Sequence, residues 1–142
     1  MVAARDVLLD AGPLIAILDA RDQWHAAAAG VGAAIFRRCV TSEAAVVEAT
    51  HMIARRRADP AVVLEFLVGL DIPIVALHRP LHEACIALMR RYAAVPMDYA
   101  DATLVALAER LGIRQVFTFD RRGFRQYRGA TGRAPFTIIP AP

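Results

Sequence analysis

Short apolar runs alternate along this chain with longer segments whose apolar residues recur at helical spacing. The runs at residues 7–9, 39–41, 72–77, 116–119 and 136–139 are rich in β-branched and aromatic side chains, which predicts five short strands. The intervening segments predict helices at residues 13–18, 24–38, 42–57, 60–69, 80–92 and 99–111. Because strands alternate with helices, we expect an α/β fold, a three-layer α/β/α sandwich with a mostly parallel central sheet of four to five strands.

Size and composition fit this interpretation. A length of 142 residues suits a single domain over residues 1–142, and the hydrophobic fraction of 57% suits buried strands. Cys39 and Cys85 lie among apolar residues, which favours buried free thiols over metal ligands. The chain has no apolar run of about 18 residues and no signal-peptide pattern at its start. We therefore expect a cytoplasmic protein with no membrane contact.

The positive charge is carried by arginine alone. All 17 basic residues are arginine, and the formal net charge is +3. Seven of them crowd the last third of the chain: Arg110, Arg114, Arg121, Arg122, Arg125, Arg128 and Arg133. Such a cluster indicates either a solvated face or a nucleic-acid surface, and the sequence leaves both open.

Carboxylates stand at the ends of the predicted strands. Asp10 and Asp120 each follow a strand directly, and Asp101 lies in the first turn of the helix that begins at residue 99. The carboxyl ends of parallel strands share one edge of a sheet, where ligand sites of open α/β folds form. Glu48 lies on one helical stripe with Thr41, so we expect a half-buried fourth acid at the same edge.

Each acid also has a local explanation. Asp10 can cap a helix before Gly12 and Pro13, and Asp120 can end a strand in a turn. Glu48 can face solvent or pair with His51 or Arg55. For Asp98, the helix cap before residue 99 is the preferred interpretation. The joint arrangement favours a common site more than any single residue does.

Four carboxylates in one pocket would repel one another unless a cation were present. Hard oxygen ligands without nearby Cys or His select Mg²⁺ or Mn²⁺ rather than zinc. These ions hold phosphate groups and activate a bound water, so the pattern indicates phosphoryl chemistry.

Three stretches carry a resemblance to a known family: "VLLDAGPLIAILD", "VTSEAAVVEATHMI" and "MDYADATLVALAERLGIRQVFTFDRRGF". The chain resembles the PIN-domain family, and more narrowly its VapC-type toxin ribonucleases, over nearly its whole length. The resemblance implies that four acids are both catalytic and metal-binding: Asp10, Glu48, Asp101 and Asp120. It implies that Thr118 orients a metal-bound water and that Asp98 is an additional acid behind the four. Gly12 departs from the serine or threonine that the family often has at this position.

The resemblance further implies Mg²⁺- or Mn²⁺-dependent cleavage of single-stranded RNA by a metal-activated water. Arg121 and Arg122 are candidates for phosphate contact. The family also implies a homodimer and a cognate VapB-like antitoxin as partner.

Other functions fit less well. A haloacid-dehalogenase-type phosphatase needs a second aspartate where Gly12 stands and a lysine, and a receiver domain also needs a lysine; the chain has none. A PIN-like RNA-binding or RNA-processing module outside a toxin–antitoxin pair stays open, although all four family acids are present.

Overall fold

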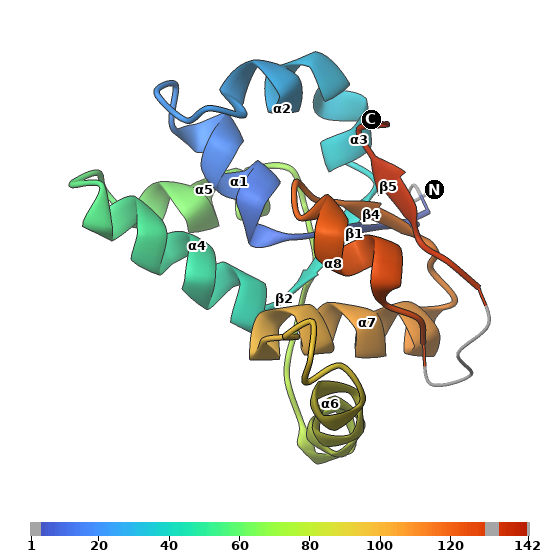
Figure 1. Cartoon of the computed structure of the whole chain (residues 1–142). Coiled ribbons are helices and arrows are strands. Elements are labelled where there is room, and N and C mark those ends of the chain that lie inside the picture. The colour runs from blue at the N-terminus through green and yellow to red at the C-terminus, as the bar shows by residue number, and fades with distance from the viewer. Residues whose placement is uncertain (1–3, 130–133, 142) are drawn as a thin grey trace.

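Five parallel strands form the centre of the computed structural model, which describes residues 4–129 and 134–141 (Figure 1). The strands are β1 (Val7–Leu9), β2 (Cys39–Ser42), β3 (Ile74–Val75), β4 (Gln115–Phe117) and β5 (Thr137–Ile139). Their order across the sheet is β3-β2-β1-β4-β5, and every neighbouring pair is parallel. The predicted α/β class is confirmed.

Helices cover both faces of this sheet. One face packs against α1 (Ala11–Leu18), α2 (His25–Val31), α3 (Ala33–Phe36), α4 (Glu43–Arg55) and α5 (Ala61–Gly69). The other packs against α7 (Tyr99–Leu111) and α8 (Arg121–Gln126), and α6 (Arg79–Arg91) packs against α7 (Figure 1). Alternation along β1 explains the two cores: Val7 and Leu9 enter the first, whereas Leu8 enters the second. The result is the predicted three-layer arrangement.

Several helices begin at the carboxyl edge of the sheet. Side chains at this edge satisfy the free backbone N–H groups of their first turns. Asp10 caps α1, Ser42 caps α4 and Asp98 caps α7, each by accepting a bond from a backbone N–H. Asp120 caps α8 in the same way. Because α7 leads into β4 of a parallel sheet, its first turn lies at the edge where β1 and β4 end.

Some predicted elements differ in the structure, and one element was not predicted. The helix expected over residues 24–38 is broken at Gly32, whose φ of 86° and ψ of 163° no helix permits, into α2 and α3. The strand expected over residues 72–77 shortens to Ile74–Val75, since as an edge strand it pairs only with Thr41 and Ser42. Helix α8 was not predicted; its six residues bury Phe124.

Two further expectations concern the interior and the membrane. Cys39 and Cys85 are buried free thiols, as predicted. Within residues 4–129 and 134–141, no helix has both the length and the apolar character needed to cross a bilayer.

Candidate active site

Asp10 and Thr118 join the ends of the two central strands. Asp10 is buried; its Oδ1 accepts from the backbone N–H of Ala11 at 2.8 Å, and its Oδ2 accepts from the Thr118 hydroxyl at 2.7 Å. Thr118 is fully buried and in turn accepts from the Asp120 N–H at 2.9 Å. The strand order reverses at β1, so these residues stand at the switch point where open α/β sheets bind ligands.

Asp101 is held from two sides in the first turn of α7. Its backbone N–H donates to Oδ1 of the cap Asp98 at 2.8 Å. Its carboxylate Oδ2 accepts from the Tyr127 hydroxyl at 3.0 Å. Tyr127 follows α8 and is only 1% exposed, so packing fixes the direction of its hydroxyl. These contacts therefore orient the Asp101 carboxylate without pairing it with a positive charge.

Gly123 makes room for Asp120 and Tyr127 to lie close together. A Cβ on Gly123 would stand 2.5 Å from Asp120 Oδ2 and 2.9 Å from the Tyr127 hydroxyl, closer than real Cβ atoms approach such groups. The Gly123 N–H donates to Asp120 Oδ1 at 3.1 Å. Asp120 is exposed, so its carboxylate is oriented by one end of α8 and open to solvent.

Glu48 stands at the rim of the site on α4. It is exposed rather than half-buried as expected. The alternative pairings with His51 and Arg55 do not occur among the ion pairs of residues 4–129 and 134–141. Asp98 is exposed as well and is a helix cap, as predicted.

The acids act on one another electrostatically. Burial, followed by the charges of Asp120 and Asp98, raises the pKa of Asp10 to about 6, although the Thr118 hydroxyl opposes the rise. Burial, then the charges of Asp10 and Asp98, raises the pKa of Asp101 to about 8. Protein around the Glu48 carboxylate, then the same two charges, raises its pKa to about 7. A cluster that resists losing its protons is one that a cation would stabilise.

The donor set fits a hard divalent cation held mainly through water. Over the described ranges, no three Asp, Glu, His or Cys side chains form a ready-made metal cage. In the same part of the chain, none of the four predicted acids forms an ion pair. Mg²⁺ commonly binds through one or two carboxylates and keeps several waters, so an open arrangement of oriented carboxylates suits it.

Comparison with known proteins decides the family. The family model of the PIN domain matches this sequence over residues 7–130. The chain belongs to the PIN domain family. A curated relative, Ribonuclease VapC26 of Mycobacterium tuberculosis, is 29% identical over 136 residues, which cover 94% of this chain and all of the relative.

Solved structures agree on the PIN fold. The crystal structure of Mycobacterium tuberculosis VapC20, a Sarcin-Ricin loop cleaving toxin, superposes with a TM-score of 0.75. It is 20% identical, and the match covers 81% of this chain and 90% of that one. PAE2754 from Pyrobaculum aerophilum matches with a TM-score of 0.55 at 20% identity, over 98% and 93% of the two chains.

The arginines of the predicted cluster differ in their contacts. Arg114 and Arg128 donate to backbone carbonyls, so they support the fold. Arg121 and Arg122 follow Asp120 directly; Arg122 is exposed, and the Nε of Arg121 is buried with no hydrogen-bond partner among the described residues. Arg133, which belongs to the predicted cluster, lies outside the described residues.

All four predicted acids thus surround one edge of the PIN domain, and their catalytic and metal-binding roles stay predictions. Tyr127 and Gly123 are the residues that sequence reasoning missed. Their contribution depends on α8, whose short stretch "RRGFRQ" shows too few apolar positions to predict a helix. A signal was present in the four-residue spacing of Gly123 and Tyr127, which places both on one side of a helical turn.

Proposed function

We propose that this PIN domain is an endoribonuclease that cleaves single-stranded RNA by means of a metal-activated water. The observation that carries the proposal is the cluster of oriented, unpaired carboxylates at the switch point of the sheet. The similarity to Ribonuclease VapC26 supports it, because that match extends over 94% of the chain. The activity resides in a single PIN domain that spans residues 1–142.

Asp10, Asp101 and Asp120 would hold Mg²⁺ or Mn²⁺, directly or through bound water, and Glu48 would either hold the ion or orient the attacking water. When bound, the ion lowers the pKa of a water and offsets the charge of the phosphodiester. Thr118 donates its one hydroxyl proton to Asp10, so it fixes that carboxylate and can receive a hydrogen bond from a water only through its remaining lone pair. Tyr127 fixes the carboxylate of Asp101 in the same manner.

The arginines beside the acids contact the RNA backbone. Arg122 is exposed next to Asp120, and the partly buried Arg121 lies beside it. A guanidinium presents planar donors that match phosphate oxygens, and such contacts attract the polyanion to an otherwise acidic site.

In the cell, the protein is the toxin of a VapBC-type pair. It acts as a homodimer on cytoplasmic RNA, and a cognate VapB-like antitoxin blocks the acidic site. This part of the proposal is supported by the VapC names of its relatives. A short gene for a DNA-binding protein directly upstream is the expected companion; a solitary gene would point to RNA processing outside such a pair.

The test is cleavage of single-stranded RNA by purified protein with Mg²⁺ or Mn²⁺. We expect EDTA to stop the reaction and Asp101→Asn to abolish it with the fold intact. Glu83→Gln is the matched control, because this exposed glutamate lies on α6 and pairs only with Arg79 in the ion pairs of the described residues. Equal cleavage by wild type and Asp101→Asn would overturn the metal assignment, and RNA binding without cleavage would show a binding module.

A further inference from the structure

Two aromatic rings lie stacked immediately beside the acidic cluster. The ring centroids of Trp24 and Phe119 are 5.0 Å apart, and their planes are inclined by only 10°. Phe119 stands between Thr118 and Asp120 in the chain, and its ring lies 3.8 Å from the position of a Cβ on Gly12. The stack therefore lies by the first turn of α1, at the same sheet edge as the carboxylates.

The stack is anchored in the core on one side and open on the other. Phe119 is half-buried and packs edge to face against the buried Phe117, with ring centroids 6.0 Å apart. Trp24, the chain's single tryptophan, remains 39% exposed. A large aromatic ring that is supported from below and accessible to solvent offers its surface to a planar ligand.

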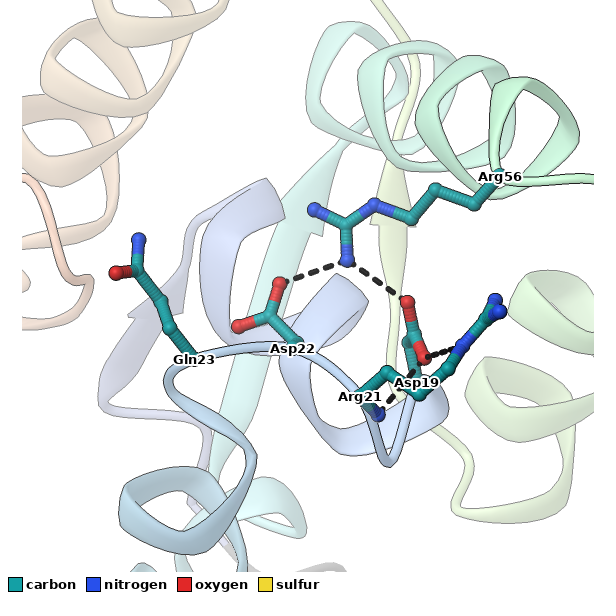
Figure 2. A pocket seen from close by; sticks show the side chains of 5 residues that line it. All are labelled: Asp19, Arg21, Asp22, Gln23 and Arg56. Atoms are coloured by element: carbon teal, nitrogen blue, oxygen red, sulfur yellow. Dashed lines mark hydrogen bonds and ion pairs between the residues drawn. The ribbon is translucent and has the colours of Figure 1, made fainter.

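A polar network fixes the loop that carries Trp24. The Trp24 backbone N–H donates to Asp22 Oδ1 at 2.8 Å. Arg56 Nη1 donates to Asp22 Oδ2 at 2.8 Å and to Asp19 Oδ2 at 2.9 Å, so one guanidinium from the residue that follows α4 binds both acids (Figure 2). The His25 ring Nδ1 lies 2.7 Å from a carbonyl of α1. These bonds preorganise the loop that carries the Trp24 ring, which reduces the entropy lost when a ligand binds to that ring.

The surroundings favour a nucleic-acid ligand. Gln23, the residue before Trp24, helps to line an open cavity of about 540 Å³ together with Asp19, Arg21, Asp22 and Arg56 (Figure 2). Arg21 Nε pairs with Asp19 at 3.3 Å and Arg56 holds both acids, while the Arg21 side chain stays 77% exposed. The two arginines balance the two acids, so an exposed guanidinium lies near the aromatic surface without net negative charge to repel a phosphate, an environment that a single strand tolerates.

We propose that the Trp24–Phe119 stack is a base-binding subsite, on which an unpaired nucleobase stacks while the adjoining phosphodiester lies at the acidic cluster. The inference rests on the proposed ribonuclease function and deepens it. Every base has a π-face, so the subsite holds the strand without reading its sequence. It accepts only bases that are splayed out of a helix, which accounts for a preference for single strands.

Kinetics on matched substrates test the subsite. The cleavage site is first mapped. Cleavage is then compared between RNA with an intact base next to the cleaved bond and RNA with an abasic nucleotide at the same position. Trp24→Leu is expected to raise KM on intact RNA about 10-fold or more, with kcat little changed, since stacking on an aromatic side chain contributes that much per base. Trp24→Phe is expected to recover most of the loss. On abasic RNA, wild type and Trp24→Leu are expected to be alike.

Val68→Ala is the control, because Val68 is an exposed apolar residue on α5. Fluorescence adds a direct readout: with the single tryptophan in the subsite, intact RNA should quench the emission of the Asp101→Asn variant and abasic RNA should not. Equal losses on both substrates, or cleavage by the wild type without quenching of the Asp101→Asn variant by intact RNA, would overturn the subsite. Failure of the wild type to cleave any RNA would overturn the proposed function itself.

Discussion

Asp101→Asn should stabilise the metal-free protein while it abolishes cleavage. The pKa of Asp101 rises from its ordinary value of 3.8 to about 8. A folded state that binds this proton more tightly than the unfolded state loses stability as pH rises from about 4 to about 8, and the full penalty is present above that range. Asparagine carries no charge and can still accept the Tyr127 hydroxyl, so the variant escapes the penalty.

The magnitude follows from the size of the pKa rise. At roughly 1.4 kcal/mol for each tenfold change in proton affinity, the upper bound above pH 8 is about 6 kcal/mol. Solvent access and relaxation around a partly exposed carboxylate reduce this to about 3 kcal/mol at pH 8 and about 1 kcal/mol at pH 5. For a domain of this size, the first value corresponds to a Tm increase of about 10 °C.

Thermal unfolding of EDTA-treated protein at the two pH values measures the effect. Glu83→Gln is the matched control, since this exposed glutamate on α6 lies outside the acidic cluster and should change stability by less than about 1 kcal/mol. Mg²⁺ should raise the Tm of the wild type and leave Asp101→Asn nearly unchanged. A lower Tm for Asp101→Asn than for the wild type, or an equal increase in Tm at both pH values, would refute the claim that the charge of Asp101 destabilises the metal-free protein.

Four further changes test the parts of the site. Tyr127→Phe removes the hydroxyl that orients Asp101 and should weaken Mg²⁺ affinity about 10-fold by calorimetry, with unchanged affinity contradicting its role. Gly123→Ala places a methyl 2.5 Å from Asp120 Oδ2 and should reduce kcat without unfolding the chain; full activity would show that the carboxylate moves freely. Thr118→Val leaves a buried Asp10 oxygen without its donor, so chemical denaturation should show a loss of about 2 kcal/mol. Arg122→Gln should reduce the slope of log affinity for RNA against log salt by about 1, whereas an unchanged slope would place Arg122 away from phosphate.

The strands and the acid positions were predictable because they depend on local pattern. Asp10 and Asp120 each follow an apolar run, and parallel strands bring such positions to one edge whatever the loops between them do. Asp98 was correctly predicted as the helix cap, since a capping residue followed by an acid three residues later is a local signature.

The features that the sequence did not predict depend on tertiary packing. Helix α8 forms because Asp120 caps it and Phe124 enters the core, and neither effect is visible in six mostly polar residues. Glu48 was expected to be half-buried from its helical stripe, yet it stands at the rim, since a helical stripe does not fix how deeply the helix packs. The Trp24–Phe119 contact joins residues 95 positions apart, beyond the reach of any local pattern.

Calorimetric titration of Mg²⁺ into EDTA-treated protein at pH 7 tests the central claim most directly. With the pKa of Asp101 at about 8 and that of Glu48 at about 7, cation binding should release roughly one proton, detectable as a dependence of the heat on buffer ionisation. We predict saturable binding with proton release in the wild type and none in Asp101→Asn. Absence of binding in the wild type, or equal binding by both proteins, would contradict the claim that these carboxylates form a divalent metal site.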